Sequence, residues 1–472
     1  MTSTATNLQP VQVFPGGSGV SALEVFGRLG REMPLTVVRL GAAGGTPGRF
    51  TMVGVVASTK TVEIEEYAEA GTLCPPTVAG GGGVDCDSVR TDASGSDSAL
   101  STRHSALPFG PGWFVALPYE LGRVLEPVSG CLSNSALSTH RSGLPAVWQR
   151  IENALVHDAV TDTWSGFGEW EALLERARVV PAVTEAFALG AIEVAANREK
   201  FVGNVQRALE YICAGDIYQA NITHALRTTL GGSARALAAR LFALANPAHG
   251  CVARFVHQGT QHTLISCSPE LFLAGNLRTR AMMTRPMKGT RPADADPSEL
   301  VRSIKDQAEL AMIIDLMRND LGRVCELGSV CVDAARTIER HGDAGSGVLQ
   351  ATGTIRGRLR EGTTLDALLR ATFPGGSITG APKIRAEQII AELEGEPRGY
   401  YCGSMGYVAD DGMVEMSIAI RTAHVKGEEF AFAVGAGIVA DSDPEQEWME
   451  TLDKAWLLGP VMNRGLASWA RK

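Results

Sequence analysis

The chain has 472 residues, of which 45% are apolar and 20% are charged, and its formal net charge is −9 at pH 7. This composition is typical of a globular protein with a large core, and the length allows about three domains. The net negative charge and the lack of a block of Lys and Arg exclude a sequence-independent nucleic-acid surface. We also expect no membrane segment, because the sequence has no run of about 18 apolar residues.

The N-terminus and the cysteines together predict a cytoplasmic location. Residues 1–5 lack the basic start and the apolar run of a signal peptide. The nine cysteines are scattered, and the closest pair, Cys325 and Cys331, has neither a zinc-binding nor a redox spacing. An odd number of cysteines without a disulfide framework is typical of a reducing compartment.

The N-terminal part is predicted to be one domain that a loop interrupts. Residues 69–106 are rich in Gly and Ser and poor in apolar residues, which predicts a flexible insertion. Apolar residues return after it, and a strand is expected at 113–117. A second change in composition, near 176–196, divides the chain into predicted domains at 1–185 and 186–472.

The pattern of helices and strands is clearer in the second domain. Apolar residues recur at helical spacing after Asn197, which is the expected N-cap. The next predicted strand, at 217–223, places Gln219 and Ile222 on opposite faces. Strand pairs joined by turns, with separate helices, indicate an α+β fold with antiparallel sheets. Further strands are predicted at 262–266, 403–408, 414–423 and 429–434, and helices at 298–318, 364–372, 384–393 and 444–457.

Two of these helices carry acidic side chains at a spacing that allows them to converge. Lys305 and Glu309 are four residues apart and therefore share one helix face. Glu447, Glu450 and Lys454 share a face of the last helix in the same way. Surface ion pairs are the alternative interpretation. Carboxylates that meet from two helices would instead suit the oxygen-rich coordination shell of Mg²⁺.

The segment at 375–383 is a candidate anion-binding loop. Its small residues lead into a predicted helix, so backbone N–H groups would be exposed at the positive end of that helix. It does not have the spacing of a nucleotide-binding P-loop, and Pro382 precedes Lys383. An ordinary turn between a loop and a helix is the alternative.

Three single side chains have chemistry that periodicity alone leaves open. Arg421, on the predicted strand at 414–423, is either solvated or able to bind a carboxylate with its guanidinium group. Glu270 ends a Ser-Pro-Glu segment and would be a proton donor if an apolar pocket raised its pKa. Lys288, between a Pro and a Gly, would be a nucleophile if desolvated and is otherwise a solvated side chain.

Ordered motifs along most of the chain resemble the chorismate-utilising enzymes. This family includes the first components of anthranilate synthase and aminodeoxychorismate synthase, and the isochorismate and salicylate synthases. The resemblance implies two large antiparallel sheets packed as a sandwich and flanked by helices, as in anthranilate synthase component I. The motifs, in order, are Gly215-Asp216-Ile217-Tyr218-Gln219, Ser268-Pro269-Glu270, Ile314-Asp315-Leu316-Met317-Arg318-Asn319-Asp320-Leu321-Gly322-Arg323 and Gly435-Ala436-Gly437-Ile438-Val439-Ala440-Asp441-Ser442.

The same resemblance implies roles for individual residues. Glu270 matches the general acid of the family, and Lys288 matches a catalytic lysine. Glu309 and Glu450 match ligands of Mg²⁺, and Glu447 matches a nearby or water-mediated one. The groups expected around chorismate are Ser377, Thr379, Gly380, Lys383, Tyr401, Arg421, Gly435, Gly437 and Lys454.

Three positions bear on the branch of the family. Water-adding members have a lysine where this chain has Gln219, which disfavours water addition. Anthranilate synthases usually have Ala where Lys288 stands, whereas aminodeoxychorismate synthases have Lys. Gln350 replaces a His that is linked with pyruvate elimination in aromatising members, which favours a product that keeps the enolpyruvyl ether.

The expected activity is therefore Mg²⁺-dependent amination of chorismate at C4 to 4-amino-4-deoxychorismate, the precursor of 4-aminobenzoate and folate. The chain lacks the Gly-x-Cys-x-Gly motif of a glutaminase. A separate glutamine amidotransferase subunit is thus the expected partner and source of ammonia. The alternatives are anthranilate synthase component I and a non-catalytic, Mg²⁺-dependent anion-binding module.

Overall fold

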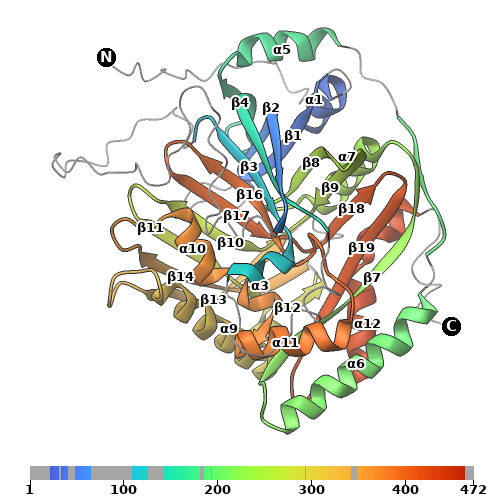
Figure 1. Cartoon of the computed structure of the whole chain (residues 1–472), viewed down its shortest axis with the longest axis vertical. Helices are drawn as coiled ribbons and strands as arrows, with labels where there is room; N and C mark the ends of the chain where they lie inside the picture. Colours follow the sequence, from blue (N-terminus) through green and yellow to red (C-terminus); the bar gives the residue numbers. More distant parts are fainter. Residues whose placement is uncertain are drawn as a thin grey trace.

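The computed structural model of this chain (Figure 1) describes residues 22–30, 33–40, 48–64, 109–125, 143–180, 185–192, 194–292, 294–341 and 348–462. The insertion predicted at 69–106 lies outside the described residues. In the described ranges, no helix is both long and apolar enough to cross a membrane.

Antiparallel β-strands are joined by hydrogen bonds across the described structure. The strand predicted at 113–117 is confirmed. In chain order the strands are β1 (Leu35–Leu40), β2 (Phe50–Val62), β3 (Gly112–Leu117), β4 (Ala146–Asp158), β5 (Thr163–Phe167), β6 (Phe187–Leu189), β7 (Gln219–Gly232), β8 (Cys251–His257), β9 (Thr260–Ser266), β10 (Leu271–Asn276), β11 (Ala281–Arg285), β12 (Met287–Pro292), β13 (Cys331–His341), β14 (Val348–Arg358), β15 (Gly380–Ala381), β16 (Ser404–Ala409), β17 (Met413–Ile418), β18 (Thr422–Lys426) and β19 (Glu429–Ile438).

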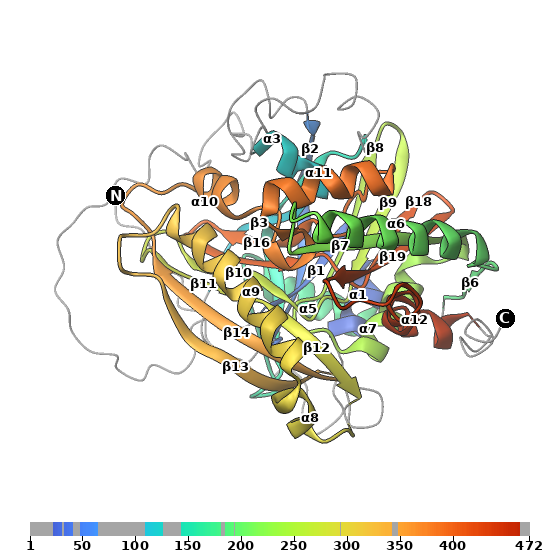
Figure 2. The same cartoon turned by 90° about the horizontal axis from the view of Figure 1, so that it is seen from below.

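Helices flank the strands (Figures 1 and 2), so the predicted α+β class is confirmed. The sandwich arrangement of two sheets stays a prediction. The helices are α1 (Ala22–Leu29), α3 (Gly122–Leu125), α5 (Trp170–Val179), α6 (Ala195–Cys213), α7 (Ala234–Ala245), α8 (Pro297–Arg302), α9 (Ile304–Gly322), α10 (Leu365–Thr372), α11 (Lys383–Glu394) and α12 (Pro444–Lys454), with 3₁₀ turns η1 (Tyr119–Leu121), η2 (Gly376–Ile378) and η3 (Trp456–Val461).

Hydrogen bonds join the strands into one continuous path. From β14 the path runs through β11, β10, β17, β16, β3, β4, β2, β1, β8, β9, β18 and β19 to β7. β12 joins the first end by pairing with β14, and β15 joins the last end by pairing with β7. The path crosses the predicted domain boundary at 185 and 186 twice, at β3–β16 and β1–β8. The boundary itself stays a prediction.

Two helices reach the site from opposite ends of this path. α9 buries the stripe Leu310, Ile313, Ile314 and Met317 against the strands, and Figure 2 shows it lying along β14. α12 buries Trp448 in a cluster shared with α6 and α11. The apolar stripe of each helix packs against the core. The polar face of each helix is therefore turned toward the space between α9 and α12.

Three local predictions were wrong. The helix predicted at 298–318 is interrupted at Ser303, whose extended backbone and hydroxyl cap the start of α9 by accepting a bond from the Asp306 N–H at 3.2 Å. Asn197 is not an N-cap. It lies inside α6, and its amide donates to the Ala225 carbonyl at 2.9 Å. The strand predicted at 414–423 is broken between β17 and β18, where Arg421 has a φ of 50°.

Candidate functional site

Lys288 lies on β12, at one end of the strand path, and its side chain lies beside β19 and β7, at the other end. This residue is partly buried, and β12 changes register just after it, between positions 288 and 290. Gly289 makes the bulge possible because its φ is +71°, a conformation that favours glycine. The bulge leaves the Lys288 side chain facing the β7–β19 end of the path.

The Lys288 amine reaches β19 and β7 directly. A β-carbon placed on Gly437 of β19 would lie 2.9 Å from the Lys288 Nζ and 3.1 Å from the Gln219 Nε2 on β7. A side chain at 437 would crowd the ends of these two flexible side chains, which would have to shift. Lys288, Gln219 and Gly437 thus lie close together. The roles predicted for Lys288 and Gly437 stay predictions.

Glu270, between β9 and β10, lies on the buried side of the space beside Lys288. Its side chain is enclosed, and burial raises its pKa to about 7, although Ser377 and Lys288 act in the opposite direction. The Ser268 hydroxyl fixes the backbone by accepting from the Glu270 N–H at 3.1 Å and donating to the Ile418 carbonyl at 2.6 Å. A carboxyl with this pKa can hold and release a proton near neutral pH.

Several buried polar atoms around this space have no hydrogen-bond partner of good geometry among the described residues. They are the Glu270 Oε1, the Ser377 Oγ, and both amide atoms of Gln219. The Ser377 hydroxyl is still close enough to Glu270 to lower the pKa of that carboxyl. Buried polar groups in native proteins are nearly always satisfied, by protein, water or ligand. Their gathering near Lys288 indicates a polar site that water or a polar ligand would satisfy.

Arg421 lies near the same carboxyl, whereas Tyr401 lies beside Arg398 and Glu394. The Arg421 charge lowers the pKa of Glu270, a small effect beside that of burial. The left-handed backbone at Arg421 lets its carbonyl accept from the Cys267 N–H at 3.0 Å, which ties the chain to the Glu270 segment. Tyr401 is buried within the hydrophobic core, and burial raises the pKa of its phenol.

The segment at 375–383 is held tightly at the edge of this polar site. The Thr379 hydroxyl donates to the Gly375 carbonyl at 3.0 Å, and Gly380 pairs with Ala220 of β7. The Lys383 ammonium does not extend toward Lys288. It donates to Asp320 of α9 at 2.5 Å and to the Thr372 carbonyl at 3.1 Å. Contact of Lys383 with a substrate stays a prediction, and these bonds indicate that it supports the loop.

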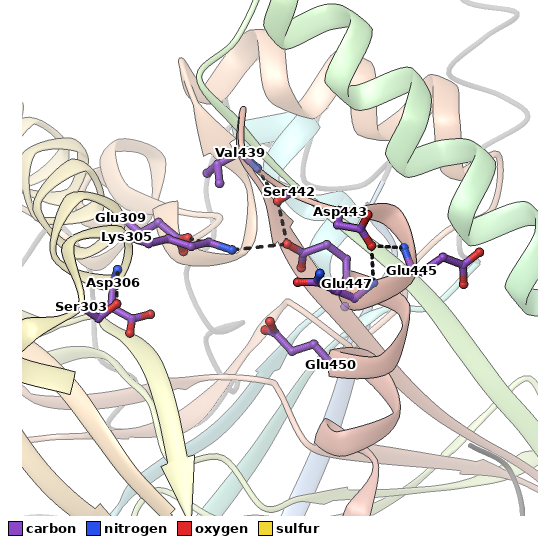
Figure 3. Close-up of polar contacts among 12 residues, drawn as sticks. Ser303, Lys305, Asp306, Glu309, Val439, Ser442, Asp443, Glu445, Glu447 and Glu450 are labelled. Atoms are coloured by element: carbon purple, nitrogen blue, oxygen red, sulfur yellow. Dashed lines mark hydrogen bonds and ion pairs between the residues drawn. The ribbon is translucent and has the colours of Figure 1, made fainter. Parts of the chain in front are cut away.

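The carboxylates of α9 and α12 face one another across the more open side of the site, with Lys305 between them (Figure 3). The Lys305 Nζ lies 4.0 Å from Glu309 and 3.7 Å from Glu447. The Ser442 hydroxyl donates to Glu447 at 2.6 Å. Burial raises the pKa of Glu309, and the charges of Lys288 and Lys305 oppose that rise.

Glu450 and Lys454 form the outer part of this acidic group. Their charged atoms are 2.7 Å apart, and Lys454 holds the pKa of Glu450 below its usual range. Lys454 also donates to the Gly435 carbonyl at 2.9 Å. Both predicted substrate contacts, Lys454 and Gly435, therefore engage each other in this structure.

Glu309, Glu447 and Glu450 fit Mg²⁺ by the chemistry of their oxygen donors, which is what a hard divalent cation prefers. Their spacing is wider than a coordination shell. Within the described residues, no three His, Cys, Asp or Glu side chains lie close enough together to hold a metal ion. A lysine ammonium, not a carboxylate contact, connects the two helices.

Sequence reasoning missed a buried ion pair that supports the site. Arg398 and Glu394 lie 2.7 Å apart and are almost fully enclosed. Arg398 donates to the Asn221 carbonyl at 2.5 Å and to the Ile378 carbonyl at 2.8 Å, and its guanidinium lies 4.5 Å from the centre of the Tyr119 ring. Because α11 ends at Glu394 and Arg398 lies beyond it, their four-residue spacing is not a helical one, and local patterns gave no signal of the pair.

The chain is similar in sequence to a family of known enzymes. The sequence matches the model of the chorismate binding enzyme family over residues 84–458. It is 41% identical over 276 residues to anthranilate synthase component 1 of Streptomyces coelicolor, a match that covers 57% of this chain and 52% of that protein. Aminodeoxychorismate synthase component 1 of Escherichia coli is 34% identical over 361 residues, with 75% and 77% covered.

The solved structures include a relative with the same fold. Anthranilate synthase component I from Streptococcus pneumoniae superimposes with a TM-score of 0.64 at 25% identity, covering 87% of this chain and 92% of that one. The chain spans about half the length of the curated anthranilate synthases it matches, 52% for both the Streptomyces coelicolor and the Aquifex aeolicus proteins.

Proposed function

The chain belongs to the family of chorismate-binding enzymes, and from that premise we propose that it aminates chorismate at C4 to give 4-amino-4-deoxychorismate. The observation that carries the proposal is the Lys288 amine close to Gln219 and Gly437, with the buried acid Glu270 beside it. Aminodeoxychorismate synthase relatives, at 34–35% identity over 75–87% of this chain, support it.

Mg²⁺, held by Glu309, Glu450 and Glu447 when bound, would neutralise the ring carboxylate and draw electron density from the ring. The residues of the chain supply the remaining requirements. Burial raises the pKa of Glu270 to about 7, so part of the population is protonated near neutral pH and can donate. Gln219 and Ser377 have unsatisfied polar atoms that can orient the substrate.

The reaction divides into two substitutions. In the first, the Lys288 ammonium loses a proton to water and its amine forms a bond to C2, the ring double bonds shift, and the C4–O bond breaks as Glu270 gives its proton to the departing hydroxyl. In the second, ammonia forms a bond to C4, the double bonds shift back, and the bond between C2 and Lys288 breaks. Two displacements place nitrogen at C4, whereas a single displacement by ammonia would leave it at C2.

The ammonia source is the second part of the proposal. We propose that a separate glutamine amidotransferase subunit supplies it, because the chain has no glutaminase nucleophile motif and several relatives are named as component 1. Free ammonium should replace glutamine at high concentration. Glutamine alone should support amination only after the glutaminase subunit is added.

The test is to incubate the purified chain with chorismate, Mg²⁺ and ammonium, and to identify the products by chromatography and mass spectrometry. We expect 4-amino-4-deoxychorismate from the native chain and a loss of at least about 100-fold in Lys288→Ala. Lys426→Ala, at the exposed end of β18, is the matched control and should keep full activity. An unchanged rate and product in Lys288→Ala would disprove the covalent step.

Anthranilate synthase component I is the second candidate, because the relatives at 40–41% identity carry that name. Fluorescent anthranilate formed without any added lyase would establish it. Gln350 is buried on β14, next to the Ala351 that pairs with Lys288, so a Gln350→His variant tests whether this position controls pyruvate loss. A non-catalytic anion-binding module would leave the ultraviolet absorbance of chorismate unchanged.

A further inference from the structure

Lys305 occupies an unusual position between two helices that are predicted to share a metal. Its ammonium lies 4.0 Å from Glu309 on its own helix α9 and 3.7 Å from Glu447 on α12. These distances are longer than a hydrogen bond, so the contact is a loose ionic one. Figure 3 shows the Lys305 side chain extending from α9 toward the Glu447 carboxylate.

The two carboxylates and the lysine differ in how far they are enclosed. The side chains of Glu309 and Glu447 are 13% and 5% exposed, whereas that of Lys305 is 53% exposed. Two enclosed carboxylates that face each other need a nearby cation. Lys305 can supply that charge and can also leave, because a long exposed side chain moves into water at little cost.

The charges around the space are balanced without any metal. Glu309, Glu447 and Glu450 face the ammonium groups of Lys305, Lys454 and Lys288. A divalent cation added to this set would meet three positive side chains. Among these three lysines, Lys305 contacts carboxylates of both helices and is the most exposed. Movement of its side chain into solvent would therefore relieve the largest part of the repulsion between the lysines and the added cation.

We propose that Lys305 is an internal counter-cation that holds the α9 and α12 carboxylates in place before metal binding and that Mg²⁺ displaces. The inference rests on the proposed assignment of Glu309, Glu447 and Glu450 as Mg²⁺ ligands. It makes Lys305 a positioning residue with two opposed effects. It stabilises the metal-free protein, and it lowers the affinity for Mg²⁺ when chorismate is absent.

The experiment compares native protein with Lys305→Met and Lys305→Arg, without chorismate. Mg²⁺ binding is measured by titration calorimetry, and the stability of the metal-free protein by thermal unfolding. We expect Lys305→Met to bind Mg²⁺ about tenfold more tightly and to unfold at a lower temperature without metal. Lys305→Arg keeps the charge and should resemble the native protein in both measurements. Lys426→Met is the control for loss of a lysine elsewhere.

Two results would overturn the inference, and they differ in meaning. If Lys305→Met binds Mg²⁺ with native or weaker affinity, Lys305 does not compete with the metal, and the proposed function is unaffected. If neither the native protein nor Lys305→Met binds Mg²⁺ at millimolar concentration, the metal assignment fails and the inference fails with it. Lys305→Gln provides a second neutral variant if Lys305→Met does not fold.

Discussion

The two sides of the site differ in the way they control charge. On the buried side, Glu270, Ser377 and Gln219 are enclosed and have polar atoms without hydrogen-bond partners of good geometry, so burial sets the pKa of Glu270. On the open side, between α9 and α12, each carboxylate lies near a lysine, and the lysines are partly exposed. The difference assigns proton transfer to the buried side, and exchange of ions and substrate to the open side.

The largest effect is expected on the buried side. Glu270→Gln should reduce amination by about 10²- to 10⁴-fold, because the variant lacks the proton donor. Steady-state rates with chorismate, Mg²⁺ and ammonium measure the loss, and Glu429→Gln, on the exposed start of β19, is the control. A decrease of less than about threefold would show that another group protonates the leaving hydroxyl.

The same substitution should stabilise the protein at alkaline pH. The pKa of Glu270 is raised from 4.5 to about 7 in the folded state, so its ionisation costs stability as the pH rises through that interval. Glu270→Gln removes this cost and should gain up to about 3 kcal/mol at pH 8, but little at pH 4. Urea unfolding at the two pH values measures the difference. An equal change in the free energy of unfolding at pH 4 and at pH 8 would contradict the raised pKa of Glu270.

Loss of the buried ion pair between Arg398 and Glu394 should lower the free energy of unfolding by about as much as Glu270→Gln raises it at pH 8. Arg398→Met leaves Glu394 enclosed without its cation, at an expected cost of about 3–5 kcal/mol in the free energy of unfolding. Replacing both, with Glu394→Gln added, should recover part of that cost. Chemical denaturation of the two variants tests this, and a double variant less stable than Arg398→Met would contradict it.

A pH profile gives a smaller effect that separates the two sides. At constant free ammonia, amination should fall as the pH rises through about 7, because Glu270 loses the proton it must donate. Mg²⁺ affinity should change little over the same interval, because Lys454 keeps the pKa of Glu450 low and that carboxylate is ionised throughout. A rate that keeps rising above pH 8 would argue against Glu270 as the acid.

The smallest effect is expected at the outer pair of the open side. Glu450→Gln should change the free energy of unfolding by less than about 1 kcal/mol, because its pair with Lys454 is partly exposed. The same variant should weaken Mg²⁺ binding measured by calorimetry. A variant that binds Mg²⁺ with native affinity would remove Glu450 from the set of ligands.

Helical spacing placed the charged side chains of each helix on the open side on one face, and it left surface ion pairs open as the alternative to a metal site. The four-residue separation of Lys305 and Glu309, and the common face of Glu447, Glu450 and Lys454, depend only on local geometry. The structure has a helix at each place, although the first is divided at Ser303, and it turns these faces toward each other (Figure 3). The motif around Lys288 was also identified from the sequence, through its resemblance to a family.

The arrangement of residues on the buried side could not be predicted, because it depends on long-range contacts that local sequence patterns do not contain. Arg421 takes a left-handed backbone because its carbonyl binds the Cys267 N–H across the chain, which strand alternation could not predict. Lys383 turns toward Asp320, 63 positions away in sequence. Gln219 was identified by its type, but its position beside Lys288 follows from the meeting of the two ends of the strand path.

The most direct test of the proposed function is the mass of the intact protein after incubation with chorismate and Mg²⁺ in the absence of any ammonia source. The account predicts an added mass equal to chorismate less one water, mapped to Lys288 by peptide analysis and lost when ammonium is added. Rapid formation of an aminated product with no adduct on the native protein, and at the same rate in Lys288→Ala, would contradict it.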